Sequence, residues 1–323
     1  MRSKNALRVC MVAALGLAAS GALQAQEDYP TKAIEIIVPA SAGGGTDLGA
    51  RTFAKYAQKK FGQPVVVVNV PGAGGYTGSK TVHEAKPDGH KVLYFHANLI
   101  TNFLTNTAPY SYDGFKVGPT LIQDGSMALF TKGDSGIKTI NDLIAKAKEN
   151  PGKLKAATEY GAFTYFMLLK LQQQQGVKFN LVDVGTDAQK ITALLGGYVD
   201  IMPRIYAGTQ SYIDAGDFNV LCVLQEEQVQ NAPNVPTCKE QGVDFTYPAY
   251  PYSFFFPKDT PQEVFDKFVQ VVQEVSQDPA FKADIEKIGL APKYISPEEA
   301  AQNFADIQEQ FTEIAKEKAE VSK

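Results

Sequence analysis

The feature that most limits the fold of this chain is a recurring order of β-branched run, glycine-rich loop and amphipathic stretch. Residues 34–38 precede a loop at 42–47 (Ala-Gly-Gly-Gly-Thr-Asp), and the four valines at 65–68 precede a second loop at 71–78. Such largely unbroken apolar runs suit strands that are covered on both faces of a sheet. Between them, residues 46–60 carry an apolar stripe at helical spacing. This alternation predicts an α/β fold with parallel sheets.

The chain has 323 residues, which are enough for two domains of roughly 100–200 residues each. Further strands and helix starts can be predicted along it. Apolar runs predict strands at residues 91–95, 128–131, 181–184 and 220–224. A Ser or Thr followed three residues later by Glu predicts helix starts at Thr237, Thr260 and Ser296. The last two of these helices are charged and have no predicted strand after them. We therefore expect both to pack on the outside of an existing lobe.

The first 25 residues have the three-part pattern of a secretory signal peptide. Three basic residues precede an apolar run over 9–22, and small residues follow it. Cleavage is expected after Ala25 or, with a better small-x-small fit, after Ala22. A buried N-terminal helix is disfavoured, because basic residues precede the apolar run and polar residues follow it. Cys10 lacks the small-residue context of a lipidated cysteine, so we expect a soluble product.

The net charge argues against nucleic acid as a partner. The chain has 31 basic and 35 acidic side chains, a formal charge of −4. The predicted leader holds three basic residues and no acidic one, so its removal leaves 28 against 35, a charge of −7. An acidic surface is unsuited to the phosphate backbone of a nucleic acid.

Two cysteines lie outside the leader. Cys222 falls in a predicted strand and Cys238 in the first turn of a capped helix soon after it, so we expect them to lie close together. In an oxidising compartment they could form a disulfide, and two buried free thiols are the equally plausible alternative.

The two glycine-rich loops are the segments best suited to bind a ligand. Glycine lets the backbone approach a ligand closely, and a following helix N-terminus offers unpaired N–H groups and partial positive charge, which together favour an anion. Nucleotide motifs fit poorly. Residues 74–81 resemble a P-loop whose spacer is one residue short, and Thr77 stands where the dinucleotide fingerprint requires its third glycine.

No pattern in the sequence points to an enzyme or a metal site. His83, His90 and His96 match no common zinc spacing, and no Gly-x-Ser-x-Gly motif is present. Cys222 and Cys238 lie in segments without histidine, so no Cys–His arrangement is visible. We expect a binding protein without catalytic residues, cofactor or metal.

Many short motifs resemble those of the tripartite tricarboxylate transporter receptors, the extracytoplasmic solute receptors also called Bug proteins. The resemblance covers essentially the whole chain after the leader, and as a set its motifs are highly specific. They are Tyr29-Pro30, Ile37-Val38-Pro39, Ala42-Gly43-Gly44, Asp47, Ala50-Arg51, Gly62-Gln63, Val65-Val66-Val67, Pro71 to Gly75, Gly78, Pro87-Asp88-Gly89, Asn150 to Leu154, Leu194 to Gly197, Val199-Asp200, Ala215-Gly216, Asn234 to Thr237, Glu240-x-Gly242 and Ser296 to Glu299.

The resemblance implies a type II periplasmic-binding-protein clamshell, in which two α/β lobes are joined by two crossover segments and enclose the ligand. One lobe is expected to hold residues 27–124 and 251–323, and the other residues 125–250. The resemblance also implies a periplasmic, monomeric receptor that passes a small carboxylate-bearing molecule to a two-protein membrane translocon. The alternative function is a sensing module that presents its closed form to a signalling receptor.

Three departures from the family pattern affect the expected site. Ala40 replaces a phenylalanine, which should enlarge the space near the first loop. Glu159 lies in a loop that is usually rich in Gly and Ser, and Val184-Gly185-Thr186 replaces Tyr-Lys-Gly. We therefore expect one ligand carboxylate at residues 42–47 and a larger, less acidic remainder, unless Arg204 reaches the site and offsets Glu159.

The residues expected to contact or orient the ligand come from both lobes. They are Ala40, Ala42, Gly43, Gly44, Thr46, Asp47, Gly74, His96, Thr158, Glu159, Gly161, Phe163, Gly185, Thr186 and Arg204.

Overall fold

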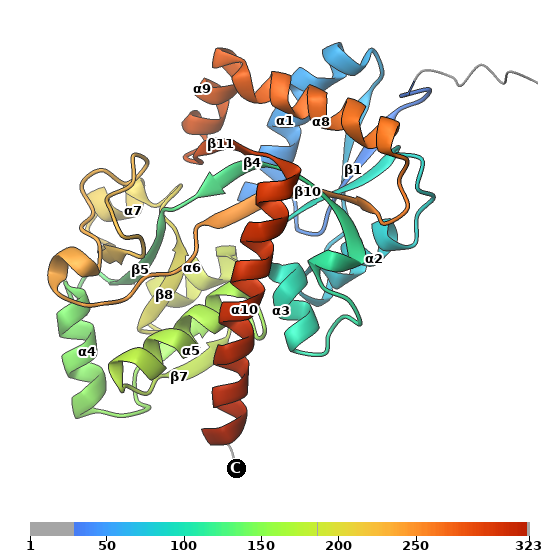
Figure 1. The fold of residues 1–323 in the computed structure, drawn as a ribbon. Helices are drawn as coiled ribbons and strands as arrows, with labels where there is room; N and C mark the ends of the chain where they lie inside the picture. Colours follow the sequence, from blue (N-terminus) through green and yellow to red (C-terminus); the bar gives the residue numbers. More distant parts are fainter. Residues whose placement is uncertain (1–28, 186, 322–323) are drawn as a thin grey trace, which may run out of the picture.

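The computed structural model describes residues 29–185 and 187–321, so the predicted signal peptide lies outside the described residues. Within this part of the chain the strands form two separate sheets with helices on both sides (Figure 1). We call the part built on the six-stranded sheet the first lobe and the part built on the five-stranded sheet the second lobe. The exact residue limits given above for the two lobes stay a prediction.

The first lobe has the strand order β11-β4-β10-β3-β1-β2. Its strands are β1 Ile34–Val38, β2 Val65–Asn69, β3 Lys91–Phe95, β4 Phe115–Asp124, β10 Tyr250–Pro257 and β11 Pro292–Ile295. Its helices are α1 Gly45–Phe61, α2 Tyr76–His83, α3 Asn98–Leu104, α8 Gln262–Gln277, α9 Pro279–Lys287 and α10 Pro297–Val321, with short 3₁₀ turns at Ala73–Gly75 and Tyr112–Gly114.

The second lobe has the strand order β7-β6-β8-β5-β9. Its strands are β5 Met127–Lys132, β6 Lys155–Thr158, β7 Asn180–Asp183, β8 Ile201–Ile205 and β9 Phe218–Val223. Its helices are α4 Ile140–Glu149, α5 Phe163–Gln175, α6 Asp187–Leu195 and α7 Gln210–Asp214, and a 3₁₀ turn at Lys239–Gln241 follows β9.

The prediction of parallel sheets is met only in part. In the first lobe β1 pairs in parallel with β2 and β3, but β10 is antiparallel to both β3 and β4. In the second lobe β5 is antiparallel to β8 and β9. The antiparallel strands are those that carry the chain from one lobe to the other. The outward crossover is only residues 125–126, between β4 and β5, and the return runs from β9 to β10.

The C-terminal helices differ from the prediction in two ways. The strand β11 separates α9 from α10 and pairs with β4, so a strand does follow the first of the two charged helices. The helix α10 also packs on both lobes rather than on one (Figure 1). Phe304 contacts Phe255 of the first lobe with ring centroids 5.2 Å apart, and Phe311 stacks on Phe166 of the second at 5.1 Å. Both α10 rings are fully buried.

An α-helix begins at two of the three predicted positions, Thr260 and Ser296. Ser296 Oγ accepts the Glu299 N–H at 3.2 Å at the start of α10. Thr237 and Glu240 form the reciprocal capping pattern, although only a 3₁₀ turn follows it. At Thr260 the helix is predicted correctly but its cap is not: the hydroxyl donates to the Pro257 carbonyl at 2.8 Å, and α8 begins after Pro261 without a side-chain cap.

The expected proximity of the two cysteines is confirmed. Cys222 and Cys238 form a disulfide with Cα atoms 5.1 Å apart. Both residues are fully buried. The bridge ties the end of β9 to the segment that follows it.

Candidate functional site

The first glycine-rich loop opens directly into α1, the 17-residue helix of the first lobe. Gly44 is the N-cap, and no side chain caps the helix there. Residues 41–44 are exposed, whereas Thr46 is buried in the first turn of α1. The N–H groups of the first turn and the positive end of the helix dipole therefore lie at the surface of the loop, which suits an anionic group.

Asp47 holds this loop in place. The carboxylate is buried and accepts the Gly43 N–H at 2.9 Å and the Arg51 Nε–H at 3.0 Å, and Asn69 Nδ2 donates to it at 2.9 Å. Burial on its own would raise the pKa of Asp47, but the hydrogen bonds from Arg51, Gly43 and Asn69 outweigh burial and lower it. An ionised Asp47 thus orients the loop, and the Gly43 N–H donates to Asp47 rather than to a ligand.

Asn69 is a residue of this loop support that the sequence reasoning missed. Its side-chain amide also donates to the Ala40 carbonyl at 3.1 Å, and its carbonyl oxygen accepts from Arg51 at 2.8 Å. The only signal in the sequence was its position at the end of the valine run. Ala40 itself is half-buried against the core of the first lobe, and Ala42 is exposed in the loop.

The second glycine-rich loop serves mainly for close packing within the first lobe. A Cβ at Gly75 would lie 2.2 Å from the ring of Phe95, and one at Gly74 would lie 2.8 Å from Asn102 Oδ1. Asn102 Nδ2 in turn donates to the Gly74 carbonyl at 3.1 Å. The glycines are required here because neighbouring side chains occupy the space that a Cβ would take.

His96 follows β3 and is buried between polar neighbours. Its Nδ1 accepts the Asn98 N–H at 3.3 Å, and the Tyr250 hydroxyl lies 2.9 and 3.1 Å from its two ring nitrogens. Burial lowers the pKa of His96 to about 3, so the ring is neutral at physiological pH. It can position Tyr250 but does not supply a positive charge for an anion.

Tyr252 connects the start of α1 with the second lobe. A Cβ at Gly45 would lie 3.0 Å from the Tyr252 hydroxyl and 3.7 Å from Ile205 Cδ1. Burial, followed by nearby charges that include Asp187, raises the pKa of Tyr252 well above its ordinary value. The Tyr252 hydroxyl of β10 therefore lies beside the N-terminus of α1 and the end of β8.

Arg204 presents buried donors in the second lobe. The sequence pattern predicts a position just beyond a strand, but Arg204 lies within β8, next to Ile205. Its side chain is 10% exposed, and Nη2 donates to Asp187 Oδ2 at 3.3 Å. Nε and Nη1 are buried and have no hydrogen-bond partner among the described residues. Buried donors are normally paired, so this guanidinium can take further acceptors.

Lys190 is a second buried cation beside Arg204, and it is not among the residues predicted for the site. Its Nζ donates to Thr164 Oγ1 at 3.4 Å and lies 4.0 Å from Asp187 Oδ1, with the side chain only 6% exposed. The only sequence signal is its spacing three residues after Asp187, which is also common on solvated helix faces.

Glu159 lies close to Lys190. Burial raises its pKa, while Lys190 acts in the opposite direction. Thr158 is buried, and its hydroxyl donates to the Glu159 carbonyl at 3.2 Å. Burial raises the pKa of Tyr250 most strongly, and the charges of Asp187 and Glu159 add to it. The second-lobe charges thus lie near a tyrosine of the first-lobe sheet.

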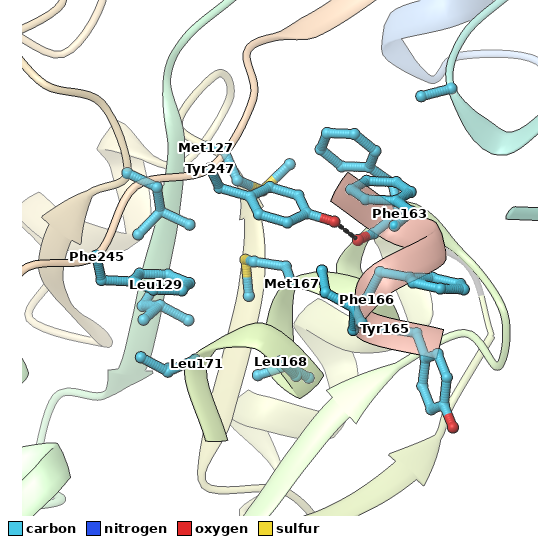
Figure 2. Packing of buried hydrophobic residues seen from close by; sticks show 14 of the residues in the cluster. Met127, Leu129, Phe163, Tyr165, Phe166, Met167, Leu168, Leu171, Phe245 and Tyr247 are labelled. Carbon is cyan, nitrogen blue, oxygen red and sulfur yellow. Dashed lines mark hydrogen bonds between the residues drawn. The ribbon is translucent and has the colours of Figure 1, made fainter. Parts of the chain in front are cut away.

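The remaining predicted residues make packing contacts or hydrogen bonds with other parts of the protein. The ring of Phe163 is buried in the core, its N–H donates to Asn98 Oδ1 of the first lobe at 3.2 Å, and its carbonyl accepts from Tyr247 at 2.7 Å (Figure 2). A Cβ at Gly161 would approach Thr105 to 3.0 Å. The Gly185 N–H donates to Asp183 at 3.1 Å. Thr186 lies outside the described residues.

Two surface cavities lie away from these groups. One of about 390 Å³ is bounded by the return segment near Tyr247 and by α10, and one of about 640 Å³ lies between α5 and α10. Neither is lined by a residue predicted for the site. Unpartnered donors and clustered charges, rather than cavity size, mark the candidate site. Within residues 29–185 and 187–321, no cluster of His, Cys, Asp and Glu suits a metal, and no helix is long and apolar enough to cross a membrane.

Comparison with known proteins decides the family. The family model described as tripartite tricarboxylate transporter family receptor matches residues 49–319. The chain belongs to this family. The UPF0065 protein in the gbd 5′ region of Cupriavidus necator is 30% identical to this receptor over 314 residues, which cover 96% of this chain and 93% of that protein.

Solved structures agree with the fold of this receptor. The periplasmic binding protein BugD has a TM-score of 0.76 and 29% identity, covering 89% of this chain and 97% of BugD. MatC from Rhodopseudomonas palustris, solved with bound malate, has a TM-score of 0.79 at 21% identity, covering 89% of this chain and all of MatC. The receptor therefore has the two-lobe clamshell fold of periplasmic solute-binding proteins, and its relatives are binding proteins rather than enzymes.

Proposed function

We propose that this receptor captures a small molecule with at least one carboxylate between its lobes and delivers it to a two-protein membrane translocon. The proposal includes export to the periplasm after removal of the signal peptide. The ligand carboxylate would bind at the uncapped N-terminus of α1, where Asp47 and Asn69 hold the loop.

The observation that carries the proposal is the buried guanidinium of Arg204. Its Nε–H and Nη1–H have no partner among the described residues. Its ion-pair partner Asp187 is among the charges that raise the pKa of Tyr252, and the Tyr252 hydroxyl lies at the start of α1. A ligand that spans from the α1 N-terminus to Arg204 would therefore meet donors at both ends.

The charges around Arg204 change the expectation of a less acidic remainder. The two cations Arg204 and Lys190 outnumber their shared partner Asp187. Burial raises the pKa of Glu159, which disfavours a negative charge on Glu159 itself. We therefore propose a second acidic or strongly hydrogen-bond-accepting group on the ligand.

Calorimetric titration of the mature protein with malate, glutamate and benzoate tests this proposal. We expect at least one diacid to bind more tightly than benzoate. Arg204→Gln should weaken that binding roughly 10- to 150-fold, since a hydrogen bond to a charged group contributes about 1.5–3 kcal/mol and each 1.4 kcal/mol is tenfold.

Lys148→Gln removes an exposed cation of α4 and serves as the matched control, which should bind as the wild type does. Unchanged diacid affinity in Arg204→Gln would contradict the role given to the second lobe. Failure of every acid to bind would contradict carboxylate capture itself.

A further inference from the structure

The loop that follows β9 reaches from the second lobe to the first. We call residues 225–236 the crossing loop. Its two ends are fixed to the second lobe, because the Cys222–Cys238 disulfide and the pairing of Val223 with Thr237 flank it. Its middle packs on the outward crossover, where a Cβ at Gly125 would lie 3.1 Å from Val229.

Asn231 in the crossing loop bonds to two groups of the first lobe. Its Nδ2 donates to Asp124 Oδ2 at 3.1 Å and to the Gly289 carbonyl at 3.1 Å. The Gly289 carbonyl can only accept, so the amide nitrogen of Asn231 must face it. Asp124 is the last residue of β4 and is fully buried, and its other oxygen accepts the Ser126 N–H at 2.7 Å.

Gly289 is held against the second lobe at another point as well. It lies in the turn between α9 and β11 with φ +82°, and a Cβ there would lie 2.7 Å from Ala207 Cβ and 3.1 Å from Ala207 Cα. Ala207 follows β8, the strand that carries Arg204 and Ile205. The turn at Gly289 is thus contacted both by the crossing loop and by the residue that follows β8.

We propose that Asn231 and Gly289 form a latch that favours the arrangement with the lobes in contact and so sets ligand affinity from outside the binding site. These contacts link groups on opposite sides of the two-residue crossover, so they are lost when the lobes rotate apart. If a ligand binds only the protein whose lobes are in contact, its apparent affinity falls in proportion to the fraction of protein in that arrangement. The affinity part of this inference rests on the proposed function.

Two variants remove the latch in different ways. Asn231→Ala deletes the amide, and Gly289→Ala places a methyl group where Ala207 stands. Gly62→Ala is the matched control, because Gly62 also has positive φ (+68°), but a Cβ added there would have no neighbouring atom within 4 Å.

Spin labels at Lys59→Cys on α1 and Lys148→Cys on α4 report the separation of the lobes without any added acid. We expect both latch variants to shift the label distances to longer values and to weaken malate binding roughly 5- to 30-fold. Gly62→Ala should leave both readouts as in the wild type.

Distance distributions that are identical in Asn231→Ala, Gly289→Ala and the wild type would overturn the latch. This readout needs no ligand, so it tests the latch even if no acid binds and the proposed function fails. Longer distances without any loss of malate affinity, in a protein that binds malate, would equally overturn the link to affinity.

Discussion

At the scale of single residues, the buried carboxylate of Asp47 controls the conformation of the first glycine-rich loop. It accepts hydrogen bonds from Gly43, Arg51 and Asn69, and these lower its pKa in the folded protein despite burial. A carboxylate with a lowered folded pKa stabilises the fold above its unfolded pKa, and this contribution is lost as pH falls through the folded value. Loop order and acid sensitivity are therefore linked at this one residue.

Asp47→Asn should unfold more easily than the wild type at pH 7, by roughly 1–3 kcal/mol, because buried donors lose a charged partner. The difference should shrink as the pH falls below 3.8, the ordinary pKa of an aspartate, and Asp47 becomes protonated. Urea unfolding from pH 7 to pH 3 measures it. Asp134→Asn, at a 74% exposed side chain, should change little throughout. A wild-type advantage that persists undiminished at the acid end would refute this account.

At the scale of secondary-structure elements, the start of α1 combines weak helix propensity with access for a ligand. Glycine within a helix is about 1 kcal/mol less favourable than alanine. At Gly45, however, a Cβ would point at the Tyr252 hydroxyl, 3.0 Å away, and at Ile205 of the second lobe. A side chain at this position would therefore crowd Tyr252 and Ile205, where the helix N-terminus meets the facing lobe.

Gly45→Ala should lower ligand affinity without lowering stability. The added methyl group occupies the space beside Tyr252, whereas helix propensity offsets the local crowding. Thermal unfolding and calorimetry on the same sample separate the two effects. Equal affinity in the variant and the wild type would show that the α1 start does not face the ligand, and a large drop in midpoint would point to crowding instead.

At the scale of the whole molecule, α10 joins the two lobes through aromatic contacts. Phe304 packs on Phe255 of the first lobe, and Phe311 packs on Phe163, Phe166 and Tyr247. The largest buried cluster runs through this helix from one lobe to the other. The lobes should therefore unfold together rather than separately.

Phe311→Ala should destabilise the protein by about 3–5 kcal/mol, because it removes a fully buried ring and leaves a cavity. It should also broaden the thermal transition or split it into two, since the joint between the lobes is weakened. Differential scanning calorimetry measures both effects. Phe103→Ala, at a 41% exposed ring, is the control and should cost little. A single sharp transition in Phe311→Ala would contradict the coupling.

The sequence by itself was enough to predict the α/β class, the loop at residues 42–47 at the start of a helix, and the proximity of Cys222 and Cys238. These features depend on local patterns: apolar periodicity, glycine before a helix, and two cysteines in adjacent elements. The family motifs extended this to the clamshell. The tertiary structure decided which strands run antiparallel, that α10 joins both lobes, and that Asn69, Lys190 and Tyr252 accompany Arg204 and Asp47. Those groupings join residues far apart in the chain, and no local pattern distinguishes a buried lysine from one in water.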